Sequence, residues 1–435
     1  MSPTTNEDKP ETATSSTPSP ANKPQWRGVA LSVLVAILAV ATGLLWRHSQ
    51  LLPAFIEKWS TGSSKSETTT TTTLWTITPN STGLLVDASI YETYLGSELS
   101  MLEESPPTNN NGKHSCVYLF LELTPKTTNA DMHREWKTNK RSSCRVMVMA
   151  NTDQFTIETL DLPNLELILC KTRQCVSWIQ QKQQEQNKKI PMFYTGFTSI
   201  VPSSASLQDD DNLERFHKFI HVAGRSPHKG TWSILQAWLQ HPHWPTLTLT
   251  SYNNQMVDHL LAQLKQQLRI QHLPSNIRHL TQKLSRAEMD HLMTSHGVHL
   301  CLSGMEGFGH YINEARAVGA LLLATNYPAM NEFVTAKNTG ILLEPSNMLE
   351  WTNGLPFANV GAPELARVMN QIVLPMSLEQ RRDYGQRAQE AFYTDRKLFQ
   401  QRMTHLQCYV ESCRHDDSTK KDASSCAHTC GLQLE

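Results

Sequence analysis

CLSGMEGFGHYINEARAVGALLLATNYPAMNEFV, residues 301–334, decides the fold of this 435-residue chain. Its pattern predicts an apolar strand, an acidic turn between glycines, a helix and a second apolar strand. Within the turn, Gly307, Phe308 and Gly309 let the backbone bend closely and open the helix. The unpaired N–H groups and the positive dipole end of such a helix bind anions, so the turn predicts a phosphate site.

Two glutamates flank the start of this helix. Glu306 lies just before it and Glu314 lies within it, with seven residues between them. A glutamate pair also occurs by chance, as two solvated carboxylates on an amphipathic helix. The strand-like runs on both sides, LCLS and ALLLAT, favour the functional interpretation.

The motif as a whole resembles that of a known family. E-G-F-G, then E-A-x-A-x-G, an apolar strand and T-N-x-P-x-x-N-E resemble the donor site of retaining nucleotide-sugar glycosyltransferases of the GT-B fold, the large family four. The resemblance implies that Glu306 hydrogen-bonds the sugar hydroxyls and that Glu314 binds the ribose. It also implies donor contacts from Gly224, Gly307, Phe308, Gly309, Asn331 and Glu332.

A second stretch, FIHVAGRSPHKGTWSILQAWL at 219–239, supplies two cations beside a predicted helix start. In the family, an arginine after such a strand and a lysine a few residues later neutralise the donor diphosphate, and Arg225 and Lys229 match these roles. The gap between them is shorter than in the commonest family pattern, which predicts a tighter loop. Alone, the stretch is more typical of a solvated turn.

The other apolar runs predict two α/β units. Strands of the first unit are predicted at LLVDASIY, CVYLFLEL, CRVMVMAN, LELILC and IPMFYTGF, and a second alternating series runs from 219 to 344. By the resemblance, the fold class is α/β with GT-B architecture: two Rossmann-like, doubly wound domains face a cleft at the carboxyl ends of their strands. A single transmembrane helix and a disordered tail precede them.

The predicted organisation has seven parts. They are a disordered cytosolic tail (1–27), a transmembrane signal anchor (28–46), a Ser/Thr-rich stem (47–83), an N-terminal Rossmann-like acceptor domain (84–212), a C-terminal Rossmann-like donor domain for the nucleotide sugar (213–375), a helix crossing back (376–407) and a Cys-rich polar tail (408–435).

Residues 28–46, GVALSVLVAILAVATGLLW, carry no charge and are long enough to cross ~30 Å of hydrocarbon as a helix. No small-residue cleavage pattern follows, which favours a retained signal anchor over a removed signal peptide. Lys23 and Arg27 before the segment are nearly balanced by cations after it, so charge does not set the orientation.

The segment after the predicted anchor resembles the stem of secretory-pathway enzymes. STGSSKSETTTTTT at 60–73 is a Ser/Thr tract, and Asn80 begins a glycosylation sequon. These features favour a single-pass type II protein of the Golgi or another secretory-pathway membrane, with its catalytic body in the lumen.

The first unit matches the family less well. A Gly-rich loop and a histidine near the sugar are frequent in the family, yet His114 and His133 are candidates only by default and are more typical of surface loops. Asn151 and Lys171 follow predicted strands and so can border the cleft, although ordinary connecting loops explain them equally well.

Asp209, Asp210 and Asp211 raise the alternative of a metal-dependent Asp-x-Asp element. No strand leads into this triplet, so we interpret it as part of a solvated linker between the units. GT-B enzymes usually need no metal, because cations and helix dipoles take its role. We therefore expect no metal site and no cofactor; the nucleotide sugar is a substrate.

Nine cysteines are distributed unevenly along the chain. Four of them, at 408, 413, 426 and 430, crowd into the polar tail, where an oxidising lumen favours two disulfides with three possible pairings. A zinc module is the alternative, although the spacing fits one only loosely. Cys170 and Cys175 are close enough in sequence to form a further bridge, although a cysteine at the end of a strand is as often part of the packing.

The resulting hypothesis is a membrane-anchored, metal-independent glycosyltransferase that acts with retention on an unknown glycan, protein or lipid acceptor. Glu306, Glu314, Arg225 and Lys229 are the predicted catalytic residues. A near-neutral net charge of −1 supplies no field for nucleic acid. Two alternatives remain: a non-catalytic, membrane-tethered module that binds nucleotide sugar or glycan, and a membrane-anchored protein scaffold.

Overall fold

The computed structural model describes residues 73–78, 82–101, 116–121, 144–152, 155–162, 164–203, 212–224, 226–252, 255–334, 338–350, 356–412 and 423–435. Several predicted features lie outside these residues: the N-terminal tail (1–27), the anchor (28–46), Asn80, His114, His133, the aspartate triplet at 209–211 and Arg225. None of the helices within the described ranges combines the length and the apolar character that a membrane span requires.

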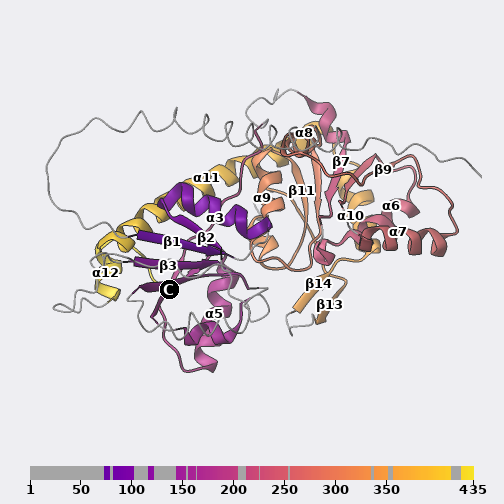
Figure 1. The fold of residues 1–435 in the computed structure, drawn as a ribbon. Coiled ribbons are helices and arrows are strands. Elements are labelled where there is room, and N and C mark those ends of the chain that lie inside the picture. Colours follow the sequence, from indigo (N-terminus) through magenta and orange to yellow (C-terminus); the bar gives the residue numbers. More distant parts are fainter. Residues whose placement is uncertain are drawn as a thin grey trace, which may run out of the picture. The chain divides into compact units, whose positions relative to one another are not determined.

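The first sheet belongs to what we call the N-half, which comprises described residues 73–203 together with 399–412 and 423–435. Its strands are β1 (Thr73–Thr78), β2 (Glu98–Met101), β3 (Cys116–Leu121), β4 (Arg145–Ala150), β5 (Leu165–Cys170) and β6 (Met192–Tyr194). They pair in parallel in the order β2-β1-β3-β4-β5-β6. Figure 1 labels β1, β2 and β3 of this sheet. Burial of β3 and β4 along their whole length is typical of a parallel sheet covered on both faces.

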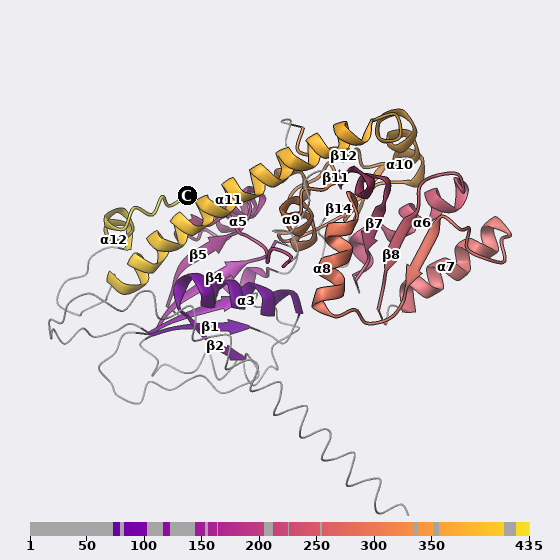
Figure 2. The same cartoon turned by 90° about the horizontal axis from the view of Figure 1, so that it is seen from above.

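The prediction of a strand at LLVDASIY was wrong, because this segment belongs to helix α3 (Thr82–Leu95). Its buried side chains include Leu84, Ala88, Tyr91 and Leu95, a spacing of three to four residues that places them on one helix face. α3 lies against β1 and β2 (Figure 2).

The first strand, β1, lies inside the range predicted as stem, 47–83. TLWTIT is rich in β-branched and aromatic residues, which pack well on a pleated sheet. β1 occupies an interior place between β2 and β3, so the folded N-half begins before the predicted boundary at Leu84.

The second sheet belongs to the C-half, described residues 212–376. Its strands are β7 (Phe219–Val222), β8 (Leu247–Thr250), β9 (Ile277–Leu280), β10 (Val298–Cys301), β11 (Leu321–Thr325) and β12 (Ile341–Leu343). They pair in parallel in the order β12-β11-β10-β7-β8-β9, which is the doubly wound order with a switch point between β7 and β10. All six strands lie within the alternating series predicted from 219 to 344.

The helices complete the two halves. They are α5 (Arg173–Glu185) in the N-half and α6 (Thr231–Gln240), α7 (Gln255–Leu268), α8 (Arg286–Ser295), α9 (His310–Ala317) and α10 (Ala362–Val368) in the C-half. Single-turn segments and a π-turn lie at 157–161, 213–217, 227–229, 330–332 and 369–373. An antiparallel hairpin, β13 (Asn347–Glu350) with β14 (Pro356–Asn359), also belongs to the C-half.

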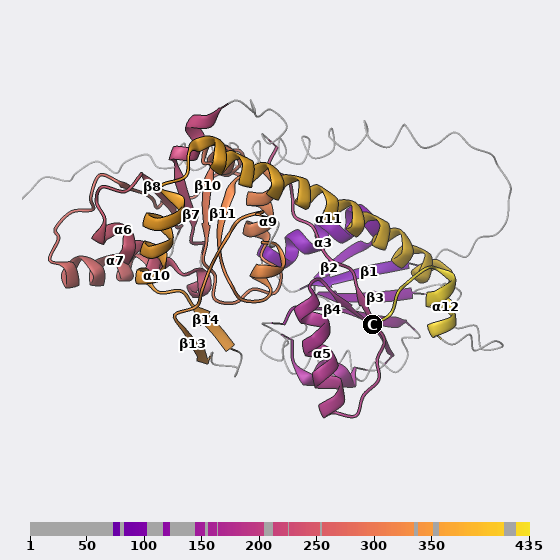
Figure 3. The same cartoon turned by 180° about the vertical axis from the view of Figure 1, so that it is seen from behind.

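Helix α11 (Leu378–Ser412) crosses from one half to the other, as the sequence predicted. It contacts α9 and β11 in the C-half, then α3 and finally α12 (Ala423–Thr429), as Figure 3 shows from behind. Near its start, Arg381 donates to the carbonyl oxygens of Phe216 and Val373. Near its end, Phe399 and Met403 are buried in the core of the N-half.

Disulfides fasten the N-half. Cys408 of α11 bonds Cys430 beyond α12, which confirms a bridge within the polar tail. The chain then runs on to Leu434, which pairs with Phe193 of β6. Cys116–Cys144 joins β3 to the residue before β4, and Cys170–Cys175 joins β5 to α5. Within the described ranges, no group of three or more His, Cys, Asp or Glu residues is arranged to hold a metal ion.

Candidate functional site

A hollow of about 390 Å³ lies where the carboxyl ends of the two sheets meet. The N-half lines it with Leu84, Asp87, Asn151 and Lys171, and the C-half lines it with Val222, Gly224, Lys229, Glu306, Gly307, Phe308, Gly309, His310, Tyr311 and Glu314. Open parallel sheets bind ligands at this edge. The structure therefore brings together the predicted catalytic residues that it describes.

Lys229 reaches the hollow from the short turn after β7. Its Nζ lies 2.5 Å from Oε1 of Glu306. The next residue, Gly230, has φ +70°, and a Cβ there would lie 2.3 Å from the carbonyl oxygen of Leu302. Glycine therefore lets the turn approach the end of β10 closely enough to pair the two side chains.

The charge of Glu306 depends on this pair. Burial alone raises the pKa of the Glu306 carboxyl, but the Lys229 ammonium and a hydrogen bond from Ser303 lower it, and the net pKa lies below its ordinary value. The carboxylate is thus ionised at neutral pH, and its exposed fraction of 17% leaves it open to the hollow.

The predicted phosphate turn has the expected geometry. Gly309 adopts φ +88° and α9 begins at the next residue, His310. The ring of Phe308 packs edge-on against Phe197 of the N-half and Phe333 of the C-half, with centroid distances of 5.2 Å in both cases. Anchored by Phe308, the turn and the start of α9 line the hollow, where helix N–H groups bind anions.

Glu314, one turn into α9, lies on the same wall. Nη1 of Arg286, from α8, is 3.6 Å from its Oε1. Burial raises the pKa of Glu314, and nearby Asp290 raises it further, while His310 and Arg286 oppose this. Arg286 is shared, because its Nε also binds Asp290 at 2.6 Å.

Three further residues meet at the N-half wall. Asp87 of α3 accepts from Nζ of Lys171 at 2.5 Å and from Nε2 of His310 at 2.8 Å. Burial raises the pKa of Asp87, but Lys171 and His310 outweigh it, so the pKa lies below its ordinary value. An ionised carboxylate of the N-half is therefore bonded to the first residue of α9.

Sequence reasoning identified only part of this group. Asn151 and Lys171 were candidates because they follow strands, and both line the hollow. The sequence does not indicate Asp87, because LLVDASIY predicts a strand and the structure makes this segment part of α3. His310 directly follows the predicted turn, yet nothing local indicates that it binds a residue 223 positions away.

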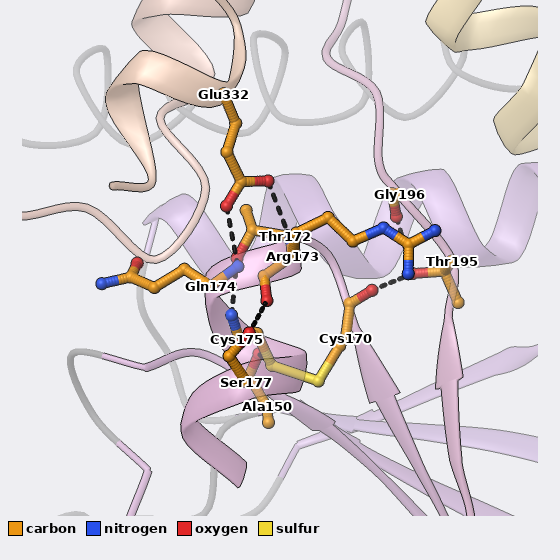
Figure 4. Close-up of a disulfide and its surroundings, with 10 residues drawn as sticks. All are labelled: Ala150, Cys170, Thr172, Arg173, Gln174, Cys175, Ser177, Thr195, Gly196 and Glu332. Atoms are coloured by element: carbon orange, nitrogen blue, oxygen red, sulfur yellow. Dashed lines mark hydrogen bonds between the residues drawn. A yellow bond between two sulfur atoms is a disulfide. The ribbon is translucent and has the colours of Figure 1, made fainter. Parts of the chain in front are cut away.

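Two predicted donor contacts lie elsewhere. Glu332 binds the N-half: its Oε2 and Oε1 accept from the backbone N–H groups of Arg173 and Gln174, each at 2.8 Å (Figure 4). It thereby caps the first turn of α5. Asn331 donates to Asn326 within its own loop at 3.1 Å. Neither residue is among those that line the hollow.

Figure 4 also shows how the start of α5 is held. The Thr172 hydroxyl accepts from the backbone N–H of Cys175 as an N-cap, and Cys175 is bonded to Cys170 at the end of β5. Burial raises the pKa of Glu332, while the two N–H groups and Arg173 oppose this. The role of Glu332 in this structure is thus to join the halves.

Taken together, the site offers an ammonium group, a helix N-terminus and ionised carboxylates within one hollow. The ammonium and the helix N–H groups can hold a diphosphate, whereas carboxylates accept hydrogen bonds from hydroxyls. This set of groups fits a ligand that is anionic at one end and rich in hydroxyls at the other. Gly224 lines the hollow as predicted.

Comparison with known proteins agrees with this chemistry. Residues 213–358 match the family described as Glycosyl transferases group 1. No curated protein matches the chain.

Solved structures share the fold at low identity. HepE from Anabaena, in complex with UDP, has a TM-score of 0.54 at 15% identity and covers 76% of this chain and 98% of its own. A glycosyltransferase from Rickettsia africae has a TM-score of 0.53 at 13% identity, covering 79% and 100%. The E. coli trehalose-6-phosphate structure bound with UDP-2-fluoro glucose has a TM-score of 0.51 at 12% identity. It covers 69% of this chain and 74% of its own.

Proposed function

We propose that this chain, which carries a group 1 glycosyltransferase domain in a GT-B fold, transfers a sugar from a nucleoside-diphosphate sugar to an acceptor hydroxyl. One observation carries the proposal: Lys229, Glu306 and the N-terminus of α9 line a single hollow at the carboxyl ends of both sheets. This arrangement pairs a diphosphate site with a carboxylate that can bind sugar hydroxyls.

The donor class is supported by the neighbouring structures. HepE has been solved with UDP and with UDP-glucose. In this chain the same kind of ligand would place its diphosphate at the start of α9 and its ribose near Glu314.

Charge development explains the proposed roles. As the bond between the anomeric carbon and the diphosphate oxygen breaks, its electron pair stays on the diphosphate. Lys229, Arg225 and the N–H groups of Gly309 and His310 would stabilise that charge. The acceptor oxygen bonds to the anomeric carbon, and its proton passes to the departing diphosphate oxygen. Glu306 would orient the sugar through its hydroxyls.

Retention of configuration is part of the proposal. The two carboxylates nearest the turn are already committed: Asp87 binds Lys171 and His310, and Glu306 binds Lys229. Neither is placed as an unshielded nucleophile, which disfavours a covalent glycosyl-enzyme route to retention. The route that we propose instead is attack by the acceptor on the face that the diphosphate leaves. The anomeric configuration of the product, measured by NMR, tests this.

We also propose that no metal is needed, because Lys229 and the α9 dipole supply the positive charge. Activity that is unchanged by excess EDTA would support this. Activity that is lost to EDTA and restored by Mn²⁺ would contradict it.

The proposed location is the lumen of the Golgi or another secretory-pathway membrane, with residues 28–46 as a type II anchor. Three disulfides among the described residues support an oxidising compartment. Glycosidase sensitivity of the protein in cells, lost in Asn80→Gln, tests the lumenal side and the use of the sequon. A body that resists glycosidase and that added protease digests in intact membranes, without permeabilisation, would contradict it.

A second candidate is a non-catalytic module that binds the donor. The family match covers 213–358 and leaves the N-half, the predicted acceptor domain, outside. This favours a chain that binds the donor without transferring its sugar. Titration calorimetry with UDP-, GDP- and ADP-sugars, paired with a product assay on the same protein, separates the two. Binding with turnover supports the transferase; binding without hydrolysis or transfer supports the module.

A further inference from the structure

A single side chain of the C-half is bound by two residues of the N-half at the edge of the hollow. His310, the first residue of α9, lies with Nε2 2.8 Å from Oδ1 of Asp87 and with Nδ1 2.9 Å from Oγ of Ser199. Asp87 comes from α3 and Ser199 from the loop after β6, so two separate segments of the N-half hold this ring.

The hydrogen-bond chemistry fixes the ring. A carboxylate only accepts hydrogen bonds, so Nε2 of His310 carries the proton that Asp87 accepts. Nδ1 then bonds the Ser199 hydroxyl, which can donate or accept. Both ring nitrogens are engaged, so the imidazole cannot flip without losing both bonds, and its position is set by the N-half.

Asp87 is itself held rigidly. Its other oxygen binds Nζ of Lys171 at 2.5 Å, and both side chains are only 2% exposed. The Lys171 ammonium lies 4.7 Å from the ring centroid of Phe197, which in turn packs edge-on against Phe308 in the turn before α9. The N-half thus supports both the turn, through Phe308, and the head of the helix, through His310.

We propose that Asp87 is a positioning residue for donor binding: acting through His310, it holds the turn at 307–309 and the first N–H groups of α9 in the geometry that receives the diphosphate. The inference rests on the proposed function. It assigns a donor-binding role to Asp87, a residue of the N-half. The carboxylate of Asp87 and the diphosphate of the donor are both negatively charged.

This difference in sign provides a decisive test. If Asp87 merely lined the hollow, Asp87→Asn would remove a repulsive charge and would tighten binding of an anionic nucleotide. If Asp87 is a positioning residue, Asp87→Asn should instead weaken nucleotide binding, because the amide holds His310 less firmly than the carboxylate does. We expect the nucleotide Kd to rise about tenfold, the size of one charge-assisted hydrogen bond.

The experiment measures Kd by titration calorimetry on the full-length protein, with UDP, GDP and ADP as probes. The probe that binds the wild type is then used for every variant. Asp161→Asn is the matched control, because it removes the same charge from an exposed position in the same half. It should leave Kd within about twofold of the wild type.

A second variant covers the case in which Asp87→Asn does not fold. Ser199→Ala leaves every charge in place and releases the other ring nitrogen, so Kd should rise about threefold. In a His310→Asn background, neither Asp87→Asn nor Ser199→Ala should add to the loss, because both act through that ring.

The outcomes separate the two proposals. Weaker binding by Asp87→Asn or Ser199→Ala, with no further loss in the His310→Asn background, supports the positioning role. A wild type that binds a probe while the folded variants bind it equally or more tightly overturns the positioning role alone. A wild type that binds none of the three probes overturns the proposed function and this inference with it.

Discussion

The Cβ position of Gly230 lies 2.3 Å from the carbonyl oxygen of Leu302 at the end of β10. This close approach, with φ +70°, sets the turn that carries Lys229 to Glu306. Gly230→Ala should therefore push the turn away and lower the affinity for a nucleotide probe at least about tenfold.

Gly96→Ala is the matched control for this substitution. Gly96 has φ +62°, but nothing lies within 4 Å of its Cβ position. The backbone strain is thus shared, whereas the collision belongs to Gly230 alone. Equal effects of the two substitutions on nucleotide Kd would show that the close approach has no part in the site.

Neutralising Glu306 should impair turnover more than folding. Glu306→Gln keeps the shape and removes the charge that faces Lys229, so kcat/KM should fall by about two orders of magnitude in a donor hydrolysis or transfer assay. Glu185→Gln, at an exposed position at the end of α5, is the control. A variant with wild-type kinetics would remove Glu306 from the mechanism.

The pair of Glu166 and Arg145 predicts a dependence of stability on pH. Burial raises the pKa of Glu166 to about 7, and Arg145, 3.4 Å away, opposes this only in part. The folded state binds this proton more tightly than the unfolded chain does. Its contribution to stability is therefore full below the ordinary glutamate pKa and is lost as pH rises through about 7.

Urea unfolding of the wild type and of Glu166→Gln between about pH 5 and 8 checks this. The free energy of unfolding of the wild type should fall relative to that of the variant by on the order of 3 kcal/mol over the range. Parallel curves for the two proteins would contradict the assignment.

Three buried histidines of the C-half predict the opposite response to acid. Burial lowers the pKa of His221 to about 4, of His296 to about 4 and of His299 to about 3. The unfolded chain binds these protons near pH 6.5 and the folded state does not. Stability is therefore present above about pH 6.5 and is lost as pH falls toward the folded-state pKa values.

Each histidine should contribute up to about 1.4 kcal/mol per pH unit between about pH 6 and 4. Replacing His221 with Gln, which can still bond Thr231, should flatten the acid side of the curve of unfolding free energy against pH by one proton. Calorimetry in buffers of different ionisation enthalpy measures the number of protons taken up on unfolding, which should be smaller by one in the His221→Gln variant.

The sequence predicted the C-half well because its strands are fully buried apolar runs, bounded by turns and separated by amphipathic helices. The N-half was harder to predict. β1 is only partly buried and follows a threonine tract, and α3 begins with a run, LLVDASIY, whose composition fits either element. The structure decides between them, because Leu84, Ala88, Tyr91 and Leu95 are buried at a helical spacing.

For the site, the sequence located the wall built by consecutive residues. The turn at 307–309, Glu306 and Lys229 line the hollow as predicted, since the motif is local. The contacts of Asp87 with His310 and of Glu332 with α5 join residues far apart in the chain, and no periodicity encodes them. The motif predicts Glu332 as a donor contact, and in the structure its carboxylate caps the first turn of α5.

Helix α11 makes the N-half discontinuous in sequence. Its core is formed by the segments from β1 to β6 and by residues from Phe399 onward, so the C-half is an insertion between two pieces of one folding unit. Exchanging the segment from about residue 212 to the middle of α11 would replace the whole C-half. A single junction between the halves would instead separate the N-half from the end of α11, which belongs to its core. Chimeras built on two junctions are thus the natural route to swapping donor specificity in this architecture.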